Sequence, residues 1–124
     1  MKRIRVLLVD DEPRIRKGLA MRLAIEPDLE IVGEAEDGAP ALTLTRELDP
    51  DVVLMDLNMN GMDGMTATRA LRAEAPDRKV IVLTLHDDPA TRREAADAGA
   101  GAFVGKQEGS TRLVTVIREL HGAA

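Results

Sequence analysis

Three uninterrupted apolar segments constrain the fold of this chain more than any other feature of its sequence. They are runs of four residues, at 6–9, 52–55 and 80–83, and they contain only Val, Leu, Ile and Met. Each run is too short for a helix, and none alternates between apolar and polar residues as a half-exposed strand would. Such runs are typical of strands buried on both faces, which occur in parallel sheets covered by helices.

Helical patterns lie between these segments. Two further strands are predicted, at 29–35, whose partial alternation is typical of an edge strand, and at 102–104. Helices are predicted at 38–48, 64–75 and 89–98, around Ile15, Leu19 and Leu23 after Pro13, and around Leu113, Ile117 and Leu120. Regular alternation of strand and helix predicts an α/β fold, a doubly wound parallel sheet with right-handed crossovers.

Composition narrows the class of protein. The 124 residues suit one domain, expected to span 1–124, with 17 basic and 22 acidic residues and a net charge of −5. Phe103 is the only aromatic residue, so the chain lacks the positive surface and stacking side chains that bind nucleic acid directly. It has no cysteine, no apolar run that could span a membrane and no signal-peptide pattern. We therefore expect a cytoplasmic domain without a membrane partner.

Polar residues gather where the predicted strands end. Asp10 and Asp11 follow the first strand, Asp56 follows the third, Thr84 ends the fourth, and Lys106 comes soon after the fifth. In an open α/β sheet, ligands bind beyond the carboxyl ends of the strands. The sequence therefore predicts that these side chains share one site.

The predicted site has the residue types of a phosphoryl-transfer centre. Three crowded carboxylates repel one another, and a hard divalent cation such as Mg²⁺ relieves the repulsion. Helix capping is an alternative explanation for Asp10, Asp11 and Glu12, but it accounts for only one of these acids. Thr84 could be an ordinary strand residue and Lys106 an ordinary surface lysine. Together they offer a hydroxyl and an ammonium to a phosphoryl group whose nucleophile would be Asp56.

These motifs resemble the receiver domain of bacterial two-component response regulators over the whole chain. The resemblance is carried by VLLVDDEP at 6–13, VVLMDLNMNGMDG at 52–64, Leu83-Thr84 and Lys106. It implies a flavodoxin-like receiver fold of five parallel strands in the order 2-1-3-4-5 with five helices. Segments 31–38 and 83–88 are similar to the NarL/FixJ-type subfamily, whose receivers usually precede a helix-turn-helix domain. We expect that effector domain to be absent from this chain.

The resemblance also implies residue roles. Asp56 matches the phosphorylated aspartate, and Mg²⁺ would be bound by Asp11, Asp56 and the backbone carbonyl of Asn58, with Asp10 assisting. Thr84 and Lys106 would hold the phosphoryl group.

The same resemblance bears on the switch, on phosphate hydrolysis and on the placement of the lysine. Phe103, which is otherwise a core residue of the last strand, matches the aromatic residue that acts as a switch together with Thr84. Asn58 and His86 occupy positions that tune phosphate hydrolysis, although His86 could be an ordinary surface residue. Gly105 replaces a commonly aliphatic residue, which predicts looser placement of Lys106.

The implied function is a phosphorylation-activated signalling switch. A sensor histidine kinase would donate a phosphoryl group to Asp56, and the altered surface would promote homodimerisation and control transcription. The domain would catalyse only its own phosphoryl uptake and loss. The alternatives are a stand-alone receiver that acts by protein contacts and a phosphatase of the haloacid-dehalogenase type. Asn58, at the position of that enzyme's second acid, disfavours the phosphatase.

Overall fold

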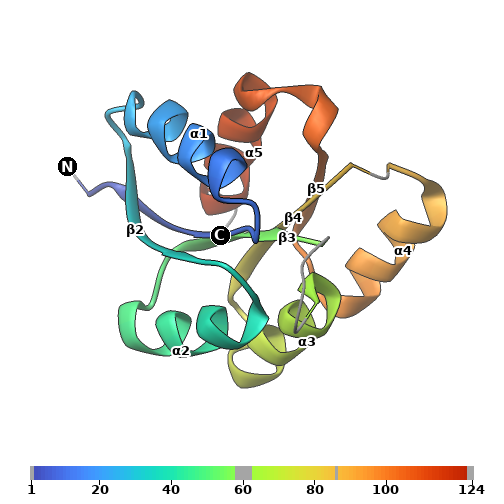
Figure 1. Cartoon of the computed structure of the whole chain (residues 1–124). Helices are drawn as coiled ribbons and strands as arrows, with labels where there is room; N and C mark the ends of the chain where they lie inside the picture. The colour runs from blue at the N-terminus through green and yellow to red at the C-terminus, as the bar shows by residue number, and fades with distance from the viewer. Residues whose placement is uncertain (1, 58–62, 86, 123–124) are drawn as a thin grey trace.

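The computed structural model describes residues 2–57, 63–85 and 87–122. Within these ranges the strands form one parallel sheet in the order β2-β1-β3-β4-β5 (Figure 1). The strands are β1 (Ile4–Val9), β2 (Leu29–Ala35), β3 (Val52–Asp56), β4 (Lys79–Thr84) and β5 (Ala102–Gly105). This topology confirms the predicted α/β fold, including the strand order and the edge position of 29–35.

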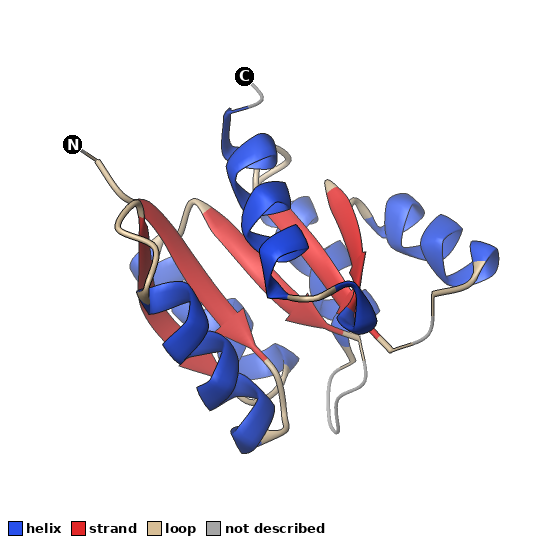
Figure 2. Ribbon diagram, turned by 90° about the horizontal axis from the view of Figure 1, so that it is seen from above, coloured by secondary structure: helices blue, strands red, loops and turns tan. Residues whose placement is uncertain are grey.

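Helices follow the strands in strict alternation and form two layers around the sheet (Figure 2). They are α1 (Pro13–Ala24), α2 (Gly38–Leu48), α3 (Gly64–Glu74), α4 (Pro89–Ala98) and α5 (Ser110–Gly122). A single 3₁₀ turn, η1 (Lys106–Glu108), precedes α5 and was not predicted. No helix in the described part of the chain is long and apolar enough to cross a membrane.

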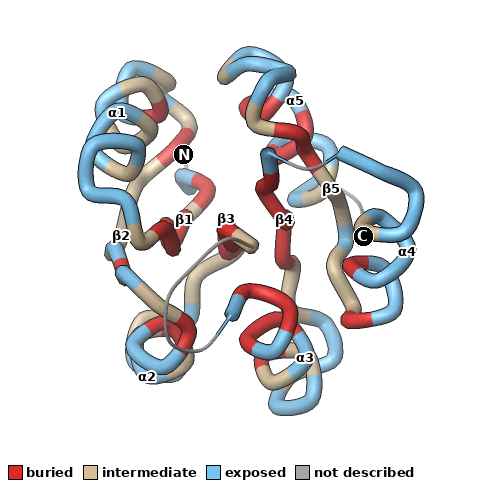
Figure 3. Tube along the Cα trace, turned by 45° about the vertical axis from the view of Figure 1, so that its right-hand side comes forward, coloured by how far each residue is buried: buried red, intermediate tan, exposed pale blue. Residues whose placement is uncertain are grey.

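The core is divided by the sheet into two sides. The side covered by α1 and α5 holds the larger cluster, to which alternate β1 residues such as Val6 and Leu8 contribute. Their neighbours Leu7 and Val9 face α2 and α3 on the other side. A small third cluster lies under α4. The central strands are therefore buried on both faces, as their apolar runs predict (Figure 3).

Local side-chain chemistry sets where the helices near the carboxyl edge of the sheet begin. Asp63 caps α3 by accepting the N–H of Thr66 at 2.8 Å, and Asp88 caps α4 by accepting the N–H of Thr91 at 2.8 Å. Each cap satisfies a backbone donor that has no partner within the helix. Gly99 ends α4 with a φ of 102°, a conformation that side chains with a Cβ rarely adopt.

Candidate functional site

Three carboxylates meet at the carboxyl edge of the sheet. Asp56 is the last residue of β3, and Asp10 and Asp11 directly follow the neighbouring strand β1. One carboxylate oxygen from each of the three lies within 4.8 Å of the other two. Asp10 and Asp56 are 2% and 1% exposed, and Asp11 is half-buried. The crowding predicted from the strand ends is therefore present in the fold.

Lys106 reaches this carboxylate cluster from the far side of β4. Its Nζ lies 3.0 Å from Oδ1 of Asp56 and 3.5 Å from Oδ2 of Asp10. The lysine side chain is only 14% exposed, so the contact is largely shielded from solvent. One ammonium cannot balance three ionised carboxylates at this spacing, and the cluster remains suited to a further positive charge.

The donor set fits a hard divalent cation. Asp10, Asp11 and Asp56 supply only oxygen atoms, which is the ligand type that Mg²⁺ prefers. The predicted backbone ligand Asn58 and the predicted tuning residues Asn58 and His86 lie outside the described residues.

The loop after β1 holds Asp10 in place. Its Oδ1 accepts the N–H of Glu12 at 2.9 Å, and its backbone carbonyl accepts a hydrogen bond from Nη1 of Arg16 at 2.7 Å. Glu12 is the residue that caps α1, so helix capping explains one acid of this segment, as the sequence indicated. Asp10 thus presents one carboxylate oxygen to the turn and the other to Lys106.

Thr84 lies in the strand between Asp56 and Lys106. It is the last residue of β4 and is 1% exposed. In the register of the sheet Leu83 is opposite Asp56, and Thr84 is opposite Gly105. The strand ends that carry Asp56, Thr84 and Lys106 are therefore side by side, as the sequence predicted.

Phe103 lies apart from the carboxylates. Its ring packs against the cluster under α4, and the guanidinium carbon of Arg92 lies 4.6 Å from the ring centroid. Arg92 also bonds Asp87 through Nε at 2.5 Å and Nη2 at 2.9 Å. This guanidinium lowers the pKa of Asp87 from its ordinary value. The arginine therefore joins α4 to the predicted switch residue and to the segment after β4.

Gly64 begins α3, and its contact with the site was not predicted from the sequence. A Cβ at this position would lie 2.2 Å from the backbone oxygen of Asp56. The first turn of α3 therefore packs directly on the end of β3, and only glycine permits that approach. The Asp63-Gly64 pair, a helix cap followed by the smallest residue, is the signal that could have identified it.

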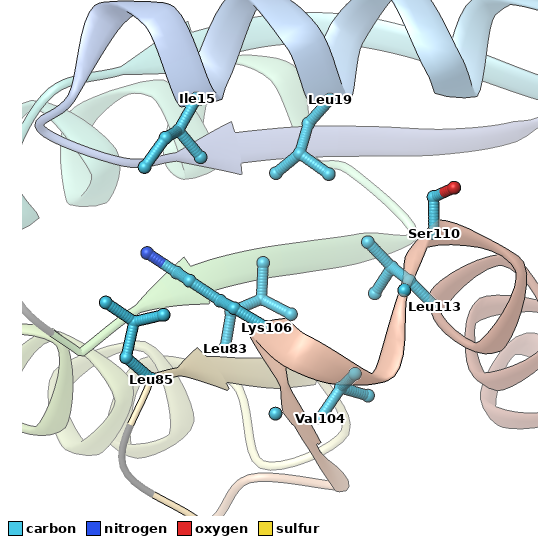
Figure 4. A pocket seen from close by; sticks show the side chains of 10 residues that line it. Ile15, Leu19, Leu83, Leu85, Val104, Lys106, Ser110 and Leu113 are labelled. Carbon is cyan, nitrogen blue, oxygen red and sulfur yellow. The ribbon is translucent and has the colours of Figure 1, made fainter.

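An apolar pocket of about 270 Å³ adjoins the lysine (Figure 4). Ile15 and Leu19 line it from α1, and Leu83 and Val104 line it from the sheet. Figure 4 shows the Lys106 side chain extending along the pocket, with its nitrogen between Ile15 and Leu85. The alkyl chain of the lysine thus lies on apolar surface while its ammonium contacts the carboxylates.

Comparison with known proteins gives a consistent result. Residues 6–118 match the response regulator receiver domain. The chain is 44% identical over 115 residues to the transcriptional regulatory protein LiaR of Bacillus subtilis, and 40% identical over 113 residues to the nitrate/nitrite response regulator protein NarP of Escherichia coli. These alignments cover 93% and 91% of the chain, but 54% and 53% of the relatives. The chain therefore spans about half the length of these relatives.

The fold is also similar to a solved receiver structure. The signal receiver domain of the putative response regulator NarL from Mycobacterium tuberculosis superposes with a TM-score of 0.94 at 34% sequence identity. The match covers 100% of both chains. The similarity therefore extends over the sheet, both helical layers and the strand ends that carry the acidic cluster.

Proposed function

The chain belongs to the response regulator receiver domain family and is of the NarL/FixJ type, and from this we propose that it is a switch activated by phosphorylation of Asp56. The observation that carries the assignment to this residue is the contact of Lys106 Nζ with Asp56 Oδ1 at 3.0 Å, inside the three-carboxylate cluster. Asp56 makes the shorter of the two contacts of Lys106 with this cluster, since Oδ2 of Asp10 lies 3.5 Å from the same nitrogen.

The proposed reaction transfers a phosphoryl group to a carboxylate. An oxygen of Asp56 forms a bond to phosphorus while the bond from phosphorus to the donor breaks. With a phosphohistidine donor, the electron pair of the P–N bond stays on the imidazole nitrogen, and the product is an aspartyl phosphate. Lys106 stabilises negative charge on the phosphoryl oxygens, and the Thr84 hydroxyl donates a hydrogen bond to one of them.

Mg²⁺ is the proposed cofactor, held by Asp11 and Asp56 with assistance from Asp10, and it would neutralise charge on the transferred group. The backbone carbonyl of Asn58 is a further proposed ligand. Asp10, already bonded to Glu12 and Lys106, keeps the lysine beside Asp56 rather than in solvent.

The proposed output is a change of surface rather than turnover of a separate substrate. Movement of Thr84 and Phe103 after phosphorylation would alter the surface around α4, as the contact between Arg92 and Phe103 supports. We propose that the domain works in the cytoplasm. Its proposed partners are a sensor histidine kinase and, on phosphorylation, a second copy of the domain. Because the related proteins named above are regulators, one of them of transcription, we propose transcriptional control through a helix-turn-helix domain. We also propose that residues 1–124 form a single receiver domain.

Phosphoryl uptake tests the assignment directly. The protein is incubated with phosphoramidate and Mg²⁺, and its intact mass is measured. We expect a gain of one phosphoryl group, absent after Asp56→Asn and retained after Asp97→Asn, a matched change at an exposed aspartate of α4. A gain that persists in Asp56→Asn, or that never occurs in the wild type, would contradict the proposal.

A further inference from the structure

Glu108 closes a hydrogen-bonded turn around the site lysine. Its Oε2 accepts the backbone N–H of Gly105 at 2.6 Å, and Gly105 immediately precedes Lys106. Glu108 is the last residue of η1, and Lys106 is the first. The carboxylate therefore bonds back across the lysine to the end of β5.

The place of this bond in the sheet explains its importance. β5 is an edge strand, so only β4 can pair with its backbone. Gly105 ends β5 opposite Thr84, and its N–H is bonded to Glu108. A bond from a backbone N–H to a carboxylate is stronger than one to a neutral acceptor. Glu108 thus fixes the point at which the chain leaves the sheet.

Two neighbours reinforce the turn. A Cβ on Gly105 would lie 2.7 Å from the side-chain nitrogen of Gln107, so the Gln107 side chain packs directly on the glycine. From the first turn of α5, Nε of Arg112 lies 3.8 Å from Oε1 of Glu108. Although glycine before the lysine predicts looser placement, Gly105 is bonded and covered in this fold.

We propose that Glu108 is a positioning residue for Lys106, an inference that rests on the proposed role of Asp56 as phosphoacceptor. The lysine side chain spans the width of β4 to place Nζ 3.0 Å from Asp56. A shift of its backbone therefore moves the ammonium away from the phosphoryl oxygens that it is to meet. Glu108 acts through this backbone and does not itself contact the reacting atoms.

Three variants test the role. Glu108→Ala removes the acceptor, and we expect the rate of Asp56 phosphorylation by phosphoramidate to fall about five-fold, a typical effect of one intramolecular hydrogen bond. Glu108→Gln keeps an acceptor oxygen and should restore most of the rate. Glu119→Ala removes an exposed carboxylate of α5 and should leave the rate unchanged. Melting temperatures of all three are measured alongside, and we expect them to stay within a few degrees of the wild type.

A double-mutant cycle shows whether Glu108 acts through the lysine. In a Lys106→Ala background, whose slower uptake is followed over longer incubation, Glu108→Ala should have no further effect. An equal loss in both backgrounds, or no loss from Glu108→Ala alone, would overturn the inference. Either result leaves the proposed function standing if the wild type is phosphorylated at Asp56. Failure of the wild type to gain mass would instead contradict the proposed function itself.

Discussion

Helices α4 and α5 lie on opposite faces of the same end of the sheet, yet they are attached by different means. α5 buries four aliphatic side chains, Leu113, Val114, Val116 and Ile117. α4 buries only Ala95 and Ala98. Because stabilisation by burial scales with apolar area, the core anchors α5 far more strongly than α4.

Polar contacts at the surface make up much of what holds α4. Asp88 caps its first turn, and Arg92 bonds Asp87 and covers the ring of Phe103. Exposed contacts of this kind each contribute little and are separately dispensable. A helix held in this way can shift without opening the core, whereas a shift of α5 would expose large aliphatic side chains. Of the two helices, α4 is therefore the one that can move at the smaller cost in buried apolar area.

The largest expected effect is the loss of stability of the whole domain after a core substitution in α5. Ile117 is fully buried, and Ile117→Ala should lower the free energy of unfolding by about 3 kcal/mol, as large-to-small core substitutions do. Ala95→Gly in α4 should cost about 1–2 kcal/mol, from helix propensity and one buried methyl group. Urea unfolding measures both. Equal losses from the two variants would show that α4 is anchored as firmly as α5.

A smaller effect is expected from the polar attachment of α4. Arg92→Ala removes the ion pair with Asp87 and the contact with Phe103, and contacts at such an exposed position contribute little to global stability. We expect amide hydrogen exchange in α4 to become several-fold faster, while exchange in α5 stays unchanged. Arg93→Ala, at the next exposed residue of the same helix, is the matched control. If both variants accelerate exchange equally, the Arg92 contacts do not hold α4.

Most of the fold could be predicted because its signals are local. Buried strands of a parallel sheet are continuous apolar runs, and Gly99 and Pro89 mark the ends of α4 where the structure has them. The strands extend one or two residues beyond their apolar runs, since Ile4, Asp56 and Thr84 pair in the sheet as well. The strands therefore end where backbone pairing with the neighbouring strand ends, and not where the apolar side chains end.

The sequence predicted which residues of the candidate site lie together. It did not predict the backbone contacts that hold them in place. Strand ends identified the carboxylates and Lys106, because parallel strands end at one edge. The contact of Gly64 with the Asp56 backbone depends on how α3 packs on β3 after folding, and its only trace in the sequence is the Asp63-Gly64 pair. The bond from Gly105 to Glu108 spans only three residues, but neither apolar periodicity nor the residue types at the strand ends indicate it.

The smallest expected effect concerns the polar attachment of α5. Arg118 bonds Asp28 through Nε and Nη2 at 2.8 Å each, and Glu26 through Nη2 at 2.6 Å. Hydrogen bonds from Arg22 and then Arg118 lower the pKa of Glu26, and those from Arg118 lower the pKa of Asp28. This ion-pair cluster ties α5 to the loop between α1 and β2.

Lowering the pH should remove the stabilisation that these ion pairs provide. Because both pKa values are lower in the folded protein, the unfolded chain binds more protons in the pH interval between the folded values and the ordinary carboxyl values of about 4. The stabilisation is therefore present at neutral pH and is lost as the pH falls through the folded pKa values. Arg118→Met should lower the melting temperature slightly at pH 7 and leave it unchanged near pH 2. A difference that stays constant from pH 7 to pH 2 would mean that the arginine acts by packing on α5 and not by its charge.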